Sequence, residues 1–400
     1  MPLEGLAASS EPFDTLAERD RAGWTALTAA VVAAYYMNPE VCERVGYAGQ
    51  RAIPFDPDAP DYLDLLESVK ARPPVYRPNA LTFRVADPDG RYAAVRLRSD
   101  LHVDGAFRRE GDAWVLAIDS DGLARLEYQL ELEHADGTVE TVLDPENPER
   151  AAGAFGEKSV MLAPGYEPPA WLDAPALAGE THDLAIRARG LGATVQVRLW
   201  DGGDGPLLVV HDGPELDRLA SLTRYCGAMI AAGELPPHRV ALLAPGSRDE
   251  WYSGSARYAR ALARDVLPAL GPADPVGLGV SLGGLAMLHA HVRSPFAGLF
   301  LQSGSFFVLR HDAHEHTHPR FGRIIRVARE LRRDAGIPEP VVMTCGVAEE
   351  NLANNRLMAR ALAAQEFEVE LHEVPDMHNF TGWRDALHPH LTRLLARVWG

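Results

Sequence analysis

Apolar residues in the first part of the chain recur at the spacing expected of a helix. They stop at Asn38-Pro39, a helix-breaking pair, and are Phe13, Leu16, Trp24, Leu27, Val31 and Tyr35. A second short helix is predicted over 61–70, between Asp61 as its N-cap and two prolines at 73–74. We therefore predict that residues 1–75 form a helical N-terminal extension packed on a later domain, and we assign no chemistry to it.

The pattern then changes to short runs in which apolar and polar residues alternate, as they do in half-buried strands. Strands are predicted over 81–85, 92–97, 114–118, 126–132 and 138–143. Several short strands at this spacing are typical of a small β-sandwich, and we predict such a domain over 76–165.

A proline-rich segment over 166–180 is expected to be a linker. Beyond it, strand and helix patterns alternate. Strands are predicted over 194–199, 207–211, 240–243, 276–280, 298–302, 341–344 and 369–374, and helices over 255–270, 285–292 and 352–364. This alternation indicates an α/β layered domain with a mainly parallel sheet over 181–400.

Composition and charge narrow the function classes. Of the 400 residues, 46% are hydrophobic and 24% are charged, which are ordinary values for a globular protein. The formal net charge of −17 repels nucleic acids and anionic membrane surfaces, so we expect neither as a partner.

The cysteines and the N-terminal residues indicate the cellular compartment in which the protein is expected. Cys42, Cys226 and Cys345 show no CxxC spacing, which argues against a zinc ribbon or a disulfide framework. Residues 1–20 lack the pattern of a signal peptide, and the most apolar stretch, 24–37, is too short to cross a bilayer. A cytoplasmic location is the expectation, with the oligomeric state left open.

The sharpest motif is Gly-Val-Ser-Leu-Gly-Gly at 279–284, which follows an apolar strand and precedes a helical stretch. This is the context of a nucleophile elbow, in which glycines allow a tight turn that exposes the serine at the start of a helix. Ser281 is therefore the predicted nucleophile. The alternative is a structural turn of glycine and serine.

A serine nucleophile needs a general base, and His378 is the predicted one because it follows the last predicted strand. The other candidates lie within predicted helices: His289, His291, His388 and His390. The alternative reading of His378 is a surface histidine.

The acid that orients the histidine is expected after the preceding strand. Glu349 is the first choice there and Glu350 the second, with Asp376 a weaker rival. Both glutamates also suit the first turn of a helix over 351–362, so a purely structural role stays open.

The oxyanion hole needs two N–H donors. One is expected from Leu282, the residue after the nucleophile. The other is expected from the loop at 211–215, where Pro214 has no N–H, so Gly213 or Glu215 must donate, and we choose Gly213. The alternative is a plain Asp-Gly-Pro turn.

Taken together, several motifs resemble those of the enterochelin esterases, iron-siderophore esterases of the esterase D-like group. They are the sandwich-like region, a His-Asp-Gly loop at 211–213, Arg-Asp-Glu-Trp at 248–251, the serine motif, and His378-Asn379 followed by Trp383-Arg384. The resemblance covers roughly residues 76–400.

That resemblance implies an immunoglobulin-like lobe followed by an α/β-hydrolase lobe. It also implies hydrolysis of the ester bonds of a catecholate trilactone, which releases iron inside the cell, with Arg248, Glu250 and Trp383 contacting the substrate. Two alternatives remain: a general carboxylesterase acting on other small esters, and an inactive binding protein on a hydrolase fold.

A segment over 310–334 is rich in arginine and histidine and is predicted to lie near the active site. Its arginines suit an anionic substrate such as a ferric catecholate. Alternatively, they form the solvated face of a helix whose inner face is Ile324, Ile325, Ala328 and Leu331. The histidine run at 311, 314, 316 and 318 is expected to bind metal only adventitiously, so we predict no metal site and no cofactor.

Overall fold

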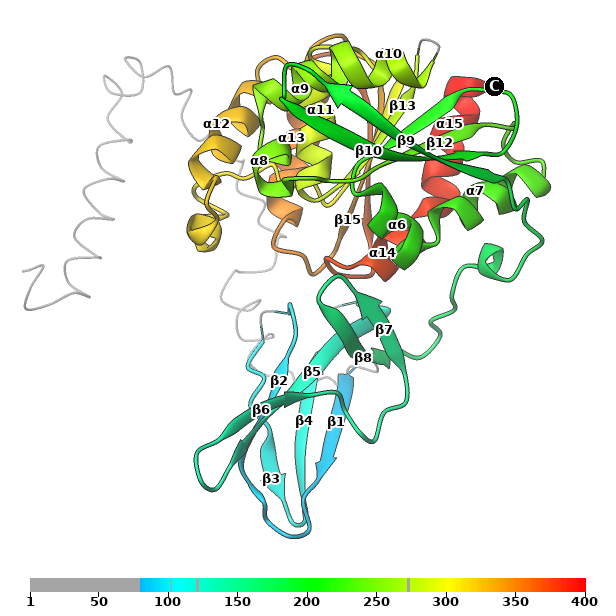
Figure 1. The fold of residues 1–400 in the computed structure, drawn as a ribbon. Coiled ribbons are helices and arrows are strands. Elements are labelled where there is room, and N and C mark those ends of the chain that lie inside the picture. The colour runs from blue at the N-terminus through cyan, green and yellow to red at the C-terminus, as the bar shows by residue number, and fades with distance from the viewer. Residues whose placement is uncertain (1–79, 102, 120–121, 272–273) are drawn as a thin grey trace, which may run out of the picture. The chain divides into compact units, whose positions relative to one another are not determined.

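The computed structural model describes residues 80–101, 103–119, 122–271 and 274–400 (Figure 1). They belong to one compact unit, Arg77–Gly400. The helices predicted within residues 1–75 lie outside the described residues. In the part of the chain that is described, no helix is long and apolar enough to cross a membrane.

The first described region consists of two antiparallel sheets. One has the strand order β1-β4-β3, and the other has the order β2-β5-β8-β7 with β6 paired to β5. The strands are β1 (Ala80–Ala86), β2 (Tyr92–Arg98), β3 (Arg108–Glu110), β4 (Ala113–Asp119), β5 (Arg125–His134), β6 (Val139–Val142), β7 (Arg150–Gly153) and β8 (Gly156–Leu162). All five predicted strands of this region are present.

Both sheets contribute to one core, as in a sandwich. Phe83 of β1 packs edge-to-face on Tyr128 of β5, with 4.9 Å between ring centroids. The hydroxyl of Tyr128 is buried and donates to Asp144. The immunoglobulin-like classification of this region stays a prediction.

The second region is built on an eight-stranded sheet with the order β16-β15-β14-β13-β11-β12-β10-β9. The six strands from β11 to β16 pair in parallel, and β10 and β9 are added antiparallel at the edge next to β12. The bounds are β9 (Glu180–Ala188), β10 (Ala193–Asp201), β11 (Leu207–Val210), β12 (Arg239–Leu243), β13 (Val276–Val280), β14 (Gly298–Gln302), β15 (Pro340–Gly346) and β16 (Glu368–Val374). The predicted α/β layered fold is present.

Helices cover both faces of this sheet (Figure 1). Neighbouring residues of β11 point to opposite faces, with Val209 in one core and Leu208 in the other. The helices on the face of Val209 are α8 (Arg248–Tyr252), α9 (Ala256–Ala261), η2 (Leu262–Val266), α10 (Leu267–Leu270), α11 (Leu282–His291), α12 (Phe321–Leu331) and α13 (Leu352–Ala363). Those on the other face are η1 (Ala170–Leu172), α6 (Gly213–Ala220), α7 (Leu222–Ala231), α14 (Phe380–Asp385), η4 (Leu387–Leu391) and α15 (Thr392–Trp399).

The connections after the parallel strands carry the predicted site residues. Parallel strands end at one common edge of the sheet, where ligands of α/β folds bind. Ser281 directly follows β13, Glu349 follows β15 and His378 follows β16. The fold therefore places the three residues at the same edge.

Candidate active site

Ser281 occupies a strained turn between β13 and α11. Its backbone angles are φ 54° and ψ −126°, a region that residues other than glycine rarely adopt and that costs about 1–3 kcal/mol. The turn needs its glycines, because a Cβ on Gly279 would lie 2.3 Å from the carbonyl oxygen of Gly283. The Ser281 N–H donates to the carbonyl of Gln302 at the end of β14, which holds the strained residue in place. This geometry matches the predicted nucleophile elbow.

His378 and Glu349 form a hydrogen-bonded pair. His378 Nδ1 lies 3.0 Å from Glu349 Oε2, and the glutamate side chain is only 1% exposed. The other carboxylate oxygen accepts from the Ser303 hydroxyl at 2.7 Å and from the Gly346 N–H at 2.8 Å. Because a carboxylate only accepts hydrogen bonds, the pair fixes the proton on Nδ1 and leaves Nε2 of the imidazole as an acceptor.

The two partners shift each other's pKa. Burial by itself raises the pKa of Glu349, but the charge and hydrogen bond of His378, with the donors Ser303 and Gly346, outweigh it and hold that pKa below its usual value. Burial likewise lowers the pKa of His378, but the hydrogen bond and charge of Glu349 outweigh it and raise that pKa. The site therefore favours an ionised glutamate beside a histidine that readily accepts a proton.

The other two candidate acids are engaged elsewhere. Glu350 Oε2 lies 2.9 Å from Nε2 of His314. Asp376 Oδ2 lies 3.3 Å from Nη1 of Arg125, and burial raises the pKa of Asp376 to about 6. Glu349 is the acid that contacts the predicted base.

Ser281 and His378 line one cavity of about 950 Å³, which we call the catalytic cavity. Among the described residues, the hydroxyl of Ser281 bonds to Ser305 Oγ at 3.4 Å and not to His378. Such contacts often tighten only when substrate binds. Both regions of the fold contribute to the lining, which includes Arg98, Glu127, Phe155, Lys158, Asp212, Arg248, Glu350 and Trp383.

Two of the three residues expected to contact substrate lie at this cavity. Arg248 is held by a double ion pair, with Nε and Nη2 each 2.8 Å from an oxygen of Asp212. Trp383 packs edge-to-face on His378 and donates its indole N–H to Ser303, the same serine that donates to Glu349. The tryptophan therefore supports the acid and the base together.

Glu250, the third, is not among the lining residues of the catalytic cavity. Its carboxylate instead lies 2.9 Å from Nη1 of Arg323 and 2.8 Å from Nη2 of Arg320. Both arginines belong to the basic segment at 310–334. That segment forms η3 (Ala313–Thr317) and α12, whose buried face includes Ile324, Ala328 and Leu331, as an amphipathic helix requires.

The predicted oxyanion donors are both first residues of helices. Leu282 begins α11 and Gly213 begins α6, and the N–H groups of a first helical turn have no partner within their helix. Leu282 follows Ser281, and Gly213 follows Asp212. Ser281 and Asp212 both have a positive φ and both line the catalytic cavity. The two helix starts therefore offer a pair of backbone donors beside it.

A network that the sequence did not indicate connects β5 to the histidine loop, the connection over 375–379 between β16 and α14 that carries His378. Arg125 is 2% exposed and donates to Asn379 Oδ1 at 3.0 Å, to Asp376, and to Glu127 at 2.8 Å. Asn379 also caps α14 by accepting from the Gly382 N–H. An arginine in an alternating strand looks like a solvent-facing residue, so only the three-dimensional contact reveals it.

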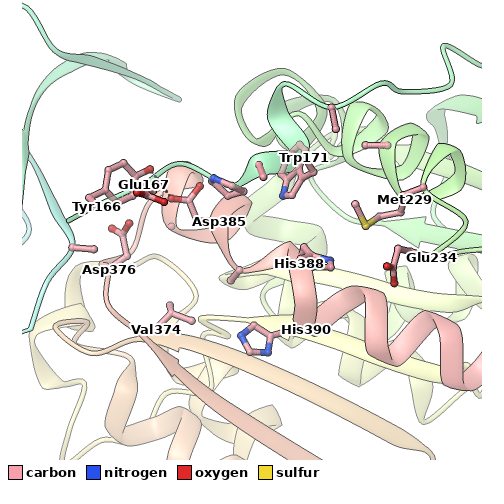
Figure 2. A pocket seen from close by; sticks show the side chains of 18 of the residues that line it. Tyr166, Glu167, Trp171, Met229, Glu234, Val374, Asp376, Asp385, His388 and His390 are labelled. Carbon is pink, nitrogen blue, oxygen red and sulfur yellow. Dashed lines mark hydrogen bonds between the residues drawn. The ribbon is translucent and has the colours of Figure 1, made fainter.

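A second cavity, of about 760 Å³, is lined by Val374 at the end of β16 and by Asp376 of the histidine loop, among other residues (Figure 2). Asp376 lies toward one end of it and Glu234 toward the other. Neither Ser281 nor His378 lines this cavity. The chemistry that the predicted residues can perform therefore belongs to the catalytic cavity.

No family model matches the chain, and no curated protein matches it. Solved structures do. An enterobactin esterase from Shigella flexneri, solved in the presence of enterobactin, is 20% identical with a TM-score of 0.59, and the match covers 80% of this chain and 92% of that one. The ferric enterobactin esterase from Salmonella typhimurium is 19% identical with a TM-score of 0.59, covering 81% and 97%. The resemblance to enterochelin esterases found in the motifs is thus confirmed, and it holds for the fold.

Proposed function

We propose that the protein is a serine carboxylic-ester hydrolase in which Ser281 is the nucleophile, His378 the general base and Glu349 the acid. The observation that carries this proposal is the buried Glu349–His378 hydrogen bond at the cavity that Ser281 also lines. A strained serine, an oriented imidazole and two helix starts are the parts that acyl transfer needs.

In the first half-reaction, His378 Nε2 takes the proton of the Ser281 hydroxyl while Ser281 Oγ attacks the ester carbonyl carbon. The backbone N–H groups of Leu282 and Gly213 stabilise the oxyanion, and the protonated imidazole then gives its proton to the departing alcohol. In the second half-reaction, His378 takes a proton from water, which attacks the acyl-enzyme, and returns it to Ser281 as the acid leaves.

For the substrate we infer a catecholate trilactone of the enterobactin type, in which the ferric ion belongs to the substrate. Enterobactin esterases share this fold along most of their length. The basic side chains of Arg98, Lys158 and Arg248 line the cavity and suit an anionic ligand. The cytoplasmic location implied by the resemblance stays a prediction.

Replacement of the nucleophile tests the reaction. Ser281→Ala is expected to lower turnover of small aryl esters by about three orders of magnitude or more, and to abolish labelling by a fluorophosphonate. Near wild-type turnover in this variant would refute the assignment of Ser281. A wild-type protein that neither labels nor turns over would instead be an inactive binding protein.

The substrate is tested separately, by turnover of ferric and iron-free catecholate trilactone beside simple aryl esters. A higher kcat/KM on the trilactone supports the siderophore assignment. Good turnover of aryl esters with none on the trilactone would indicate a general carboxylesterase.

A further inference from the structure

Three side chains that can bind a metal ion meet beside the catalytic cavity. His314 and Glu315 lie in η3, and Glu350 lies in the connection after β15. One ligand atom from each lies within 4.8 Å of the other two, and His314 Nε2 is 2.9 Å from Glu350 Oε2. We call these three residues the rim cluster.

The residue types of the rim cluster select a class of ion. An imidazole nitrogen favours zinc and similar transition metals over magnesium or calcium, and carboxylates complete such sites. Zn²⁺ holds these ligands at about 2.0–2.2 Å, so atoms that share one ion lie at most about 4.4 Å apart. All three side chains are at least partly exposed, so small rotations bring their atoms to that separation.

Charge favours a cation at the same place. The rim cluster places two carboxyl groups beside one imidazole. A divalent cation would neutralise the two carboxylates of the rim cluster.

The neighbouring histidines of the run do not take part. His316 Nδ1 lies 2.9 Å from the carbonyl of Ala313, and His318 Nε2 lies 3.9 Å from Asp249. The arrangement therefore consists of one histidine of the run and two glutamates, one of them far away in sequence. The sequence analysis instead expected the four histidines of the run to bind metal only adventitiously and predicted no metal site.

We propose that the rim cluster binds one divalent transition-metal ion of the zinc class, and that this ion tethers η3 to the connection carrying Glu349. Glu350 lines the catalytic cavity, so the site stands at its rim. Three protein ligands leave coordination positions open, as in metal sites that also hold water or a small ligand. The ion is bound, not consumed, and the esterase chemistry proposed above does not require it.

The test is a titration of the full chain with Co²⁺, whose visible absorption reports its coordination, followed by competition with Zn²⁺. We expect one saturable site in the wild type and at least tenfold weaker binding in His314→Ala and in Glu350→Gln. His316→Ala is the matched control, an exposed histidine two positions away, and is expected to bind like the wild type. Binding by the wild type that is no tighter than binding by the two variants would overturn the proposal.

Amide hydrogen exchange tests separately whether the ion links η3 to the connection after β15. Zn²⁺ is expected to slow exchange in residues 313–317 of the wild type and not of His314→Ala. Equal exchange with and without Zn²⁺ in the wild type would overturn the tether. Neither experiment uses a substrate, so failure of the metal site and failure of the esterase assignment are distinguishable.

Discussion

At the scale of single residues, the site depends on how one buried carboxylate is satisfied. Glu349 is nearly inaccessible to solvent, yet the hydrogen bonds from His378, Ser303 and the Gly346 N–H favour its ionised form. An ionised group at such a position is costly unless its partners are in place. The choice between Glu349 and its neighbour is therefore decided by buried contacts, which residue type alone does not reveal.

The first prediction compares the two adjacent glutamates. Glu349→Gln is expected to lower kcat on an aryl ester by about 10²–10⁴-fold, because an amide neither fixes the imidazole tautomer nor stabilises its cation. Glu350→Gln is the matched control and is expected to lose less than about tenfold, since its carboxylate faces His314. A larger loss in Glu350→Gln than in Glu349→Gln would reverse the assignment.

The second prediction concerns pH. Glu349 raises the pKa of His378, and the base must be unprotonated to act, so kcat/KM is expected to fall as pH decreases through a value above 6.5. Removing the anion in Glu349→Gln should move this limb to lower pH, because Glu349 makes the largest contribution that opposes the effect of burial on the pKa of His378. The measurement is the pH profile of kcat/KM for wild type and variant. An unmoved limb would mean that another group titrates there.

At the scale of elements, the hydrophobic pattern predicted the strands with strong alternation or continuous apolar runs. It missed β9, an edge strand whose residues are mostly exposed, the short β3 and β7, and β8, in which only Ser159 and Val160 are buried. These strands are set by pairing with neighbours, since their own side chains bury little. The same limit applies to Arg125, whose strand was predicted but whose contact with the histidine loop depends on tertiary structure.

The third prediction is that Arg125 positions His378 through that loop. Arg125→Met removes the positive charge that pairs with the buried carboxylates of Asp376 and Glu127 and is expected to destabilise the fold by about 3–5 kcal/mol. At temperatures where the variant is folded, kcat should fall more than KM rises, because the loop presents the base and not the substrate.

Chemical denaturation and steady-state kinetics check this prediction. The control is Arg187→Met, an exposed arginine of β9, for which both quantities should stay near wild type. The double variant Arg125→Met with Asp376→Asn removes one unpaired charge and should recover part of the lost stability. A stable Arg125→Met protein with unchanged kcat would show that the conformation of the histidine loop does not depend on Arg125.

At the scale of the whole molecule, a protein with a net charge of −17 can bind an anionic substrate only if cationic side chains neutralise the carboxylates near the site. Several carboxylates line the catalytic cavity, and the structure pairs most of them: Glu127 with Arg125, Asp212 with Arg248, Asp100 with Lys158 and Glu349 with His378. Arg98 of β2 lines the same cavity and is exposed. We therefore expect the positive charge of Arg98, which the first region of the fold contributes to this cavity, to attract an anionic substrate.

The last prediction isolates that charge. Arg98→Met is expected to raise KM for the ferric catecholate about two- to fivefold, the contribution of one partly exposed ion pair, and to leave KM for a neutral aryl ester unchanged. Arg96→Met is the matched control, because Arg96 is exposed two residues away on the same strand but does not line the cavity. Because salt screens exposed charges, the difference between wild type and Arg98→Met should shrink as ionic strength rises. An equal rise in KM for the neutral ester would mean that the arginine acts through packing, and an equal effect of Arg96→Met would mean that general surface charge attracts the substrate.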